Sequence, residues 1–230
     1  AALTRFRQEL KLTRQLAHPN VIRLYDIGAF QGFRYITMEL LEGKDLQTVM
    51  KESLSFITAL EYLQQACLGL QAAHEKGVIH RDVKPENFFV TAEGTLKIMD
   101  FGIAKRQSAP GVTVVGMIAG TPEYIAPEQI ENFTDVTPAT DQYSIGVIMY
   151  ELFTGTRPFA HPQLMQLLMK HLSEPPQPPR ARNPHIPASL EALILKCLAK
   201  KAADRFSSCR AVADALEAVK QELLRPQGRG

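Results

Sequence analysis

Apolar residues in this sequence repeat at two different spacings, which distinguish segments that fold as helices from segments that fold as strands. A first helix is predicted by apolar residues at helical spacing, Leu3, Phe6, Leu10 and Ala17. The run His18-Pro19-Asn20 ends this helix. Two strands are predicted next, over residues 21–27 and 33–40, with a turn near Gln31-Gly32 between them.

The rest of the chain is predicted to be mainly helical. A short helix over residues 45–51 is followed by a long helix that ends at Gly77. Two short apolar runs around Glu93-Gly94 predict a hairpin over residues 87–99. Residues 102–126 show no periodicity, and an irregular loop of this length is usually functional. Helices are then predicted over Tyr143 to Phe153, Leu164 to Leu172, Leu190 to Leu198 and Cys209 to Leu224.

This order of elements, one helix, a few strands and then mostly helices, predicts an α+β fold. A small sheet-containing lobe would pack on a larger, mainly helical lobe, because each element must bury its apolar face against another. Ligand sites favour such junctions.

The composition is that of an ordinary soluble protein, with 45% hydrophobic and 22% charged residues. The net charge of +2 gives no support for nucleic-acid binding. No uncharged run is long enough to span a bilayer, and residues 1–9 lack the apolar core of a signal peptide. Three distant cysteines fit neither a disulfide framework nor a zinc spacing, so we expect buried thiols in a reducing cytoplasm: Cys67, Cys197 and Cys209.

Four motifs follow one another in the middle of the chain: HRDVKPEN at residues 80–87, DFG at 100–102, GTPEY at 120–124 and APE at 126–128. The first matches the protein-kinase catalytic-loop pattern H-R-D-x-x-x-x-N, with Val83 where Leu is more usual. The others resemble the metal-binding triplet, the substrate-docking loop and the A-P-E anchor of that family. With its proline-rich connector, the chain most resembles the bacterial eukaryotic-like (Hanks-type) serine/threonine kinases, from about Phe6 to Leu223.

The resemblance implies transfer of the ATP γ-phosphate to Ser or Thr hydroxyls of protein substrates. Asp82 would accept the proton of the incoming hydroxyl as a general base, and Lys84 would reach the transferring phosphate as a point charge. Thr121 would hydrogen-bond both. Asn87 and Asp100 would supply the oxygen ligands that Mg²⁺ prefers.

The resemblance also places the adenine site in the first part of the chain. Met38 would be the gatekeeper, and the hinge would follow it, where the Glu39 carbonyl and the Leu41 N–H meet the adenine edge. Phe89 would pack beneath adenine, although a plain core role explains this residue equally well.

Other matching residues would have structural roles. His80 and Phe101 would pack in the core between the lobes. Asp141 would hold the catalytic-loop backbone, or would act only as a helix N-cap. Glu128 of the A-P-E motif would form a buried ion pair with Arg205.

One part of the family pattern is missing from this sequence. No Gly-rich loop and no strand carrying a phosphate-binding Lys precede the first helix, and Glu9 lies where the partner of that Lys is expected. A solvated helix-face Glu is the alternative for Glu9. We therefore expect a partial N-terminal lobe at residues 1–43, a C-terminal lobe at 44–224 and a tail at 225–230, in a chain cut at its N-terminus.

Two other classes of protein compete with the kinase interpretation. A pseudokinase would act as a regulatory or scaffold module, but such proteins usually lose the catalytic or the metal-binding Asp, and this chain keeps Asp82, Asn87 and Asp100. Aminoglycoside-type phosphotransferases usually read H-G-D and lack A-P-E, so Arg81 argues against them. Lys84 favours Ser/Thr over Tyr kinases.

Regulation is expected at the loop that follows the DFG motif. In the family, the Arg at the position of Arg81 binds a phosphate on this loop, and the candidate acceptors here are Ser108, Thr113 and Thr121. Thr113 is favoured by its spacing from Gly120, and a solvent-facing loop Thr is the alternative. Autophosphorylation would involve a kinase–kinase dimer. Relatives often carry a membrane span after the kinase domain, so the full-length protein would be cytoplasmic or anchored downstream.

The first testable prediction follows from the missing Gly-rich loop. Residues 1–230 alone should transfer little or no phosphate, because no Gly-rich loop covers the nucleotide phosphates and no matching Lys cradles them. Phosphate transfer from labelled ATP to a generic protein substrate measures this. Robust transfer by the 230-residue chain would refute the prediction.

Overall fold

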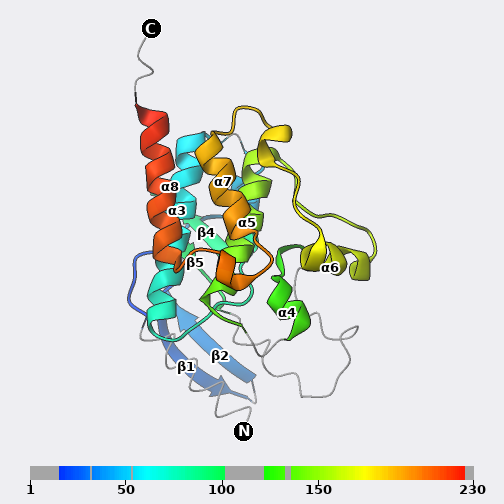
Figure 1. Cartoon of the computed structure of the whole chain (residues 1–230). Coiled ribbons are helices and arrows are strands. Elements are labelled where there is room, and N and C mark those ends of the chain that lie inside the picture. Colours follow the sequence, from blue (N-terminus) through cyan, green and yellow to red (C-terminus); the bar gives the residue numbers. More distant parts are fainter. Residues whose placement is uncertain (1–15, 32, 53, 102–121, 133–135, 226–230) are drawn as a thin grey trace.

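The structure of the chain is a computed structural model that describes residues 16–31, 33–52, 54–101, 122–132 and 136–225. Two small sheets are built from the first part of the chain, and helices form nearly everything that follows (Figure 1). The α+β fold with a small sheet lobe and a larger helical lobe is therefore confirmed. The first predicted helix lies outside the described residues as far as residue 15, and Leu16 and Ala17, which are described, are not helical.

The first sheet is an antiparallel hairpin of β1 (Leu24–Phe30) and β2 (Phe33–Met38). Both predicted strands exist, but the first begins three residues later than predicted. Val21 and Ile22 pair instead with the second sheet, where the Ile22 N–H donates to the Ile98 carbonyl at 2.9 Å. Burial explains the difference, because Val21 is 1% exposed in the helical lobe whereas much of the hairpin faces solvent.

The second sheet joins β3 (Gly43–Asp45), β4 (Phe88–Thr91) and β5 (Leu96–Ile98), in that spatial order and all antiparallel. The hairpin predicted around Glu93-Gly94 is confirmed as β4 and β5. Gly43 makes the β3–β4 contact possible, because a Cβ at this position would lie 2.1 Å from the Val90 carbonyl oxygen.

Seven α-helices occur in the described part of the chain: α2 (Leu46–Val49), α3 (Phe56–Glu75), α4 (Pro127–Glu131), α5 (Pro138–Thr154), α6 (Leu164–Ser173), α7 (Ala188–Cys197) and α8 (Cys209–Leu224). Short 3₁₀ turns connect them: η1 (Pro85–Asn87), η4 (Pro122–Tyr124), η5 (Pro179–Ala181) and η6 (Ala202–Asp204). The predicted long helix is α3, which begins where the Ser55 hydroxyl accepts the Thr58 N–H at 3.0 Å. It ends before Gly77, whose φ of +72° favours glycine.

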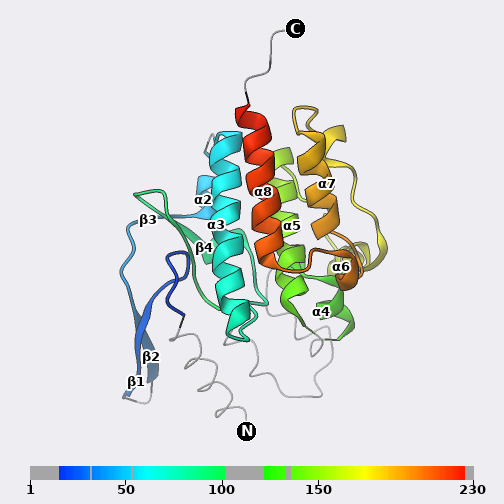
Figure 2. The same cartoon turned by 60° about the vertical axis from the view of Figure 1, so that its left-hand side comes forward.

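Helices α3, α5, α7 and α8 stand side by side and enclose the main core (Figures 1 and 2). Helix α5 is apolar nearly all round, as predicted, and its central residues are fully buried. Gly146 lets α5 approach α7, because a Cβ here would lie 2.8 Å from Cys197 Cβ. The three cysteines are buried and free. Among the described residues, no helix has the length and apolarity required to cross a bilayer.

Candidate active site

The candidate catalytic residues lie in the loop between α3 and β4. The Asn87 side-chain amide donates to the Asp82 carbonyl at 2.7 Å and lies 3.4 Å from the Asp82 carboxylate. Lys84 Nζ lies 3.9 Å from Asp82 Oδ2. The η1 turn makes this proximity possible, because it folds the chain back between Lys84 and Asn87. A carboxylate, a cation and a side-chain amide are therefore held within one short loop.

The β4–β5 hairpin brings Asp100 to this loop. Phe88 pairs with Ile98, and the Met99 N–H donates to the Asn87 carbonyl at 2.8 Å. Asp100 therefore follows immediately after the residue opposite Asn87. Its φ of +40° turns the chain away from the strand direction, a conformation that Asp tolerates better than most residues.

Asn87 and Asp100 have the donor chemistry that Mg²⁺ requires. The Asn87 amide nitrogen is occupied by the Asp82 carbonyl, so its oxygen points to the opposite side of the amide group. Mg²⁺ usually binds one or two protein oxygens together with substrate phosphates and waters. In the described ranges, no group of three or more His, Cys, Asp or Glu side chains could hold a metal ion.

A buried carboxylate fixes the backbone of the catalytic loop. Asp141, at the start of α5 and 0% exposed, accepts the His80 N–H at 3.0 Å and the Arg81 N–H at 2.9 Å. His74 Nε2 lies 2.7 Å from the same carboxylate. Arg81 has a φ of +68°, a conformation that costs a non-glycine residue roughly 1–3 kcal/mol and persists only when its surroundings hold it. Asp141 helps to hold it through two side-chain hydrogen bonds.

His80 connects the two halves of the candidate site. Its Nε2 lies 2.9 Å from the Met99 carbonyl, and its Nδ1 accepts the Asp82 N–H at 3.3 Å. Only the tautomer with hydrogen on Nε2 satisfies both contacts. Burial lowers the pKa of His80, which favours this neutral form. The ring also packs 4.9 Å from that of Phe101, so the packing expected from the sequence is accompanied by a polar link that the sequence did not predict.

The contact between His74 and Asp141 was also not predicted from the sequence. His74 lies in the last turn of α3, where a histidine gives no sign that it reaches a residue on α5. Only the packing of α3 against α5 brings the two side chains together.

The candidate adenine residues lie in the segment that joins the two sheets, residues 39–42, and in the strands beside it. Met38 ends β2, Glu39 and Leu41 precede β3, and Phe89 lies in β4 opposite Asp45. The Glu39 side chain binds Lys97 Nζ at 2.9 Å and accepts the Arg23 N–H at 2.8 Å.

The carboxylate of Glu39 is thus engaged within the protein. Burial disfavours its ionisation, but the hydrogen bonds from Lys97 and the Arg23 N–H outweigh burial and lower its pKa. Glu9, Ser108, Thr113 and Thr121 lie outside the described residues.

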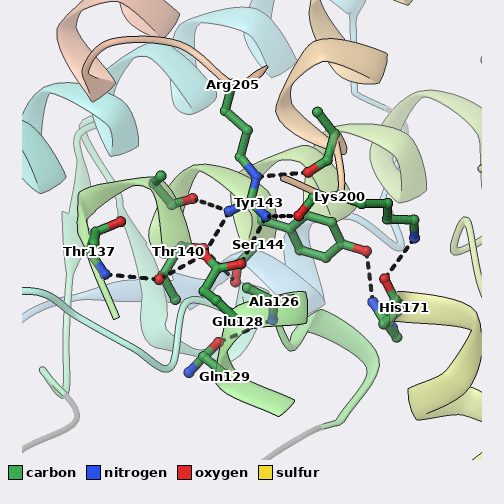
Figure 3. Close-up of polar contacts among 12 residues, drawn as sticks. Ala126, Glu128, Gln129, Thr137, Thr140, Tyr143, Ser144, His171, Lys200 and Arg205 are labelled. Atoms are coloured by element: carbon green, nitrogen blue, oxygen red, sulfur yellow. Dashed lines mark hydrogen bonds and ion pairs between the residues drawn. The ribbon is translucent and has the colours of Figure 1, made fainter. Parts of the chain in front are cut away.

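Arg205 joins the A-P-E segment to the helical lobe (Figure 3). Its Nη1 and Nη2 donate to the two carboxylate oxygens of Glu128 at 2.7 and 2.8 Å. Its remaining hydrogen-bond donors reach the backbone carbonyls of Ala139, Ala199 and Lys200. All five guanidinium N–H groups therefore have an acceptor, in a side chain that is 0% exposed.

The surroundings of Glu128 complete this junction. Burial disfavours the charged carboxylate, but Arg205 outweighs that effect and lowers the pKa of Glu128. The Thr140 hydroxyl also donates to Glu128 at 2.9 Å. Helix α4 is thus bound to the start of α5 and to the segment before α8, which is the arrangement expected from the sequence.

A second set of buried polar contacts continues from this junction to α6 (Figure 3). The Tyr143 ring lies 5.0 Å from the Arg205 guanidinium, and its hydroxyl lies 3.0 Å from His171 Nδ1. Lys200 Nζ donates to the His171 carbonyl at 2.7 Å. Burial, with a contribution from the Lys200 cation, lowers the pKa of His171 to about 3.

Comparison with known proteins identifies the arrangement. The family model described as "Protein kinase domain" matches residues 2–219. The chain belongs to the protein kinase family. The motif order, the catalytic loop and the position of the Glu128–Arg205 pair are therefore features of one kinase domain.

Bacterial kinases are among the relatives of this kinase domain. It is 43% identical over 225 residues to the serine/threonine-protein kinase PknA of Mycobacterium tuberculosis, covering 95% of this chain and 51% of PknA. It is 36% identical to a probable serine/threonine-protein kinase, CPE1738, of Clostridium perfringens, covering 95% of this chain and 32% of that protein. The chain thus spans about half or less of these relatives.

A solved structure supports the same fold. The crystal structure of the Mycobacterium tuberculosis PknI kinase domain matches with a TM-score of 0.71 and 30% sequence identity, over 94% of this chain and 78% of that one.

The Glu128–Arg205 pair predicts a large effect on stability. Arg205→Ala should destabilise the kinase domain by about 3–5 kcal/mol, because it strands the half-buried Glu128 carboxylate. Arg205→Lys should be intermediate, because an ammonium group cannot reproduce the planar fork. Thermal or urea unfolding measures both.

The exposed pair of Lys44 and Glu52 provides a matched control, with side chains 57% and 53% exposed. Lys44→Ala should cost no more than about 1 kcal/mol, as for most surface pairs. If Arg205→Ala and Lys44→Ala lowered the free energy of unfolding equally, the Glu128–Arg205 pair would not anchor α4 to the helical lobe.

His171 predicts a loss of stability in acid. Its pKa is about 3 in the folded chain and about 6.5 when unfolded, so below pH 6.5 the unfolded chain binds more protons. This group contributes stability that is fully present above pH 6.5 and declines by about 1.4 kcal/mol per pH unit as the pH falls towards 3. His171→Gln should make the loss shallower, as measured by urea unfolding between pH 7 and 4. Equal slopes for the two proteins would show that His171 titrates normally when folded.

Proposed function

We propose that this chain carries the catalytic residues of a serine/threonine protein kinase whose complete catalytic domain transfers the γ-phosphate of ATP to protein hydroxyls. The acceptor oxygen would bond to the γ-phosphorus, the bond to the ADP oxygen would break, and the hydroxyl proton would pass to Asp82. The observation that carries the proposal is the single loop that holds Asp82, Lys84 and Asn87 beside Asp100.

The short distance between the two charged groups of the loop supports these roles. Phosphoryl transfer depends mainly on positioning and charge stabilisation. Lys84 lies on the same side of the loop as the Asp82 carboxylate, so one residue can accept a proton while the other meets the phosphate. Thr121 is proposed to orient both.

ATP and Mg²⁺ are the proposed cofactors. Asn87 and Asp100 would hold Mg²⁺, which when bound neutralises charge on the nucleotide phosphates. The backbone of residues 39–41 would contact adenine, and Met38 and Phe89 would line the adenine site. Glu9 would lie near the nucleotide phosphates, as the partner of the phosphate-binding Lys. Protein kinases as a family use this pair of cofactors.

Substitution of the base and of the metal ligand tests the proposal. In the complete gene product, Asp82→Asn and Asp100→Asn should each lower kcat by at least about 100-fold, because a positioned base and a metal site each contribute several kcal/mol. Both variants should keep the wild-type circular dichroism spectrum. Phosphorylation of a generic Ser/Thr substrate, with a Tyr substrate in parallel, measures the loss.

Asp214→Asn is the matched control, because Asp214 is exposed on α8, away from the loop. Its kcat should equal that of the wild type. Near-normal turnover by Asp82→Asn would remove the base assignment. Nucleotide binding without transfer by the wild-type gene product would favour a pseudokinase.

Regulation through Thr113 is a further part of the proposal. The buried Nε of Arg81 has no hydrogen-bond partner among the residues that the structure describes, and a buried donor of this kind normally finds an acceptor. A phosphate on Thr113 would supply one, adding nearly two negative charges.

Mass spectrometry of the active gene product should therefore find phosphate on Thr113, and Thr113→Ala should lower kcat because the loop would lose its anchor to Arg81. Ser108→Ala, in the same loop, is the control. An unmodified Thr113 with an unchanged rate for Thr113→Ala would exclude this switch.

The cellular setting is also a proposal. We propose a cytoplasmic kinase domain, in a protein that is free or anchored downstream of it, that pairs with a second copy for autophosphorylation. We also propose that residues 1–43 belong to the N-terminal lobe and residues 44–224 to the C-terminal lobe.

A further inference from the structure

Gln129 makes two hydrogen bonds whose partners lie far apart in the sequence. It belongs to α4, directly after Glu128, and is only 5% exposed. Its Oε1 accepts the Ala126 N–H at 3.1 Å, within its own helix (Figure 3). Its Nε2 donates to the Arg81 carbonyl at 2.9 Å, in the catalytic loop. One buried amide therefore joins the A-P-E segment to the residue before Asp82.

The Arg81 carbonyl belongs to the peptide unit that ends at the Asp82 nitrogen. Gln129 holds the oxygen of this unit, and His80 Nδ1 accepts its N–H at 3.3 Å. The preceding N–H, that of Arg81, is held by Asp141. Because a peptide unit is planar, holding both its oxygen and its N–H fixes the direction in which the Asp82 side chain extends from the backbone.

The unusual backbone conformation of Arg81 makes this support necessary. Its φ of +68° is unfavourable for a residue with a Cβ. Without the Gln129 donor, the Arg81 carbonyl would lose its hydrogen bond, and only the 3.3 Å contact with His80 would hold this peptide unit. The Asp82 carboxylate would then be less firmly oriented.

Helix α4 is itself firmly held. The residue before Gln129 is bound to Arg205 by two hydrogen bonds. Gln129 therefore donates from a fixed position.

We propose that Gln129 is a positioning residue that sets the orientation of Asp82 by holding the 81–82 peptide unit. It acts through the backbone and does not touch substrate. This inference rests on the proposed kinase function, since the consequence of misplacing Asp82 is a slower chemical step.

A plain structural role for Gln129, as the cap of α4, predicts different behaviour. Gln129→Glu separates the two roles, because a carboxylate still accepts the Ala126 N–H but no longer donates to the Arg81 carbonyl. Gln65→Glu is the matched control. The Gln65 amide likewise donates to a carbonyl, that of Gly94 at 3.4 Å, and accepts the Leu96 N–H at 2.8 Å, away from the loop.

In the complete gene product, Gln129→Glu should lower kcat about 10- to 100-fold, as expected for a small misplacement of a reacting group. The KM values for ATP and for the protein substrate should change by less than about two-fold, because ground-state binding is retained. Gln65→Glu should keep the wild-type kcat. If Gln129→Glu does not fold, the neutral Gln129→Met variant is measured in its place. Its kcat should likewise fall while its KM values stay nearly unchanged.

Amide hydrogen exchange in the 230-residue chain provides a readout that needs no activity. The Asp82 amide should exchange at least about ten-fold faster in Gln129→Glu than in the wild type, while the amides of α3 and α8 keep their rates. An unchanged kcat, an unchanged Asp82 exchange rate, or an equal loss of kcat in Gln65→Glu would each overturn the proposal. A wild-type gene product that transfers no phosphate would refute the kinase function instead, and the exchange rates would still decide whether Gln129 holds the loop.

Discussion

The candidate site depends on the hydrogen bonds that the buried carboxylate of Asp141 accepts from the catalytic loop. Removing a charge from water is costly, and this cost is offset only when hydrogen bonds satisfy the carboxylate. Here the donors are the backbone N–H groups of His80 and Arg81, with His74 at the same carboxylate. The fold can bury Asp141 only if the catalytic loop takes its strained conformation, so core packing and site geometry stabilise each other.

The same principle operates at the A-P-E segment. Arg205 is a fully buried cation whose five donors are all used, and Glu128 is its only anionic partner among the residues described. Three elements, α4, α5 and the segment before α8, converge on this pair. The pair therefore fixes the position of α4 relative to α5 and to the segment before α8.

Much of the fold followed from patterns along the chain. The part of α5 from Tyr143 to Phe153 was predicted because it is apolar nearly all round, although the helix begins five residues earlier, at Pro138. The β4–β5 hairpin was predicted because two apolar runs flank Glu93-Gly94. The start of β1 was wrong by three residues, because the sequence cannot show that Val21 pairs with β5. The hydrogen bond between Gln129 and Arg81 could not be predicted either. The two residues are 48 positions apart, and no motif or spacing in the sequence relates one to the other.

The sequence by itself determined which chemical groups this protein has and their order along the chain: a carboxylate, a lysine and an amide in one loop, and a second carboxylate after a hairpin. Local spacing suffices for this, because the η1 turn and the hairpin register are short-range features. Tertiary structure decided how these groups are held. The positive φ of Arg81 and the burial of Asp141 depend on α4 and α5 packing against the loop, and the tautomer of His80 depends on the Met99 carbonyl at the end of the hairpin. Such contacts arise only when distant segments share one core, where each unpaired polar group must find a partner.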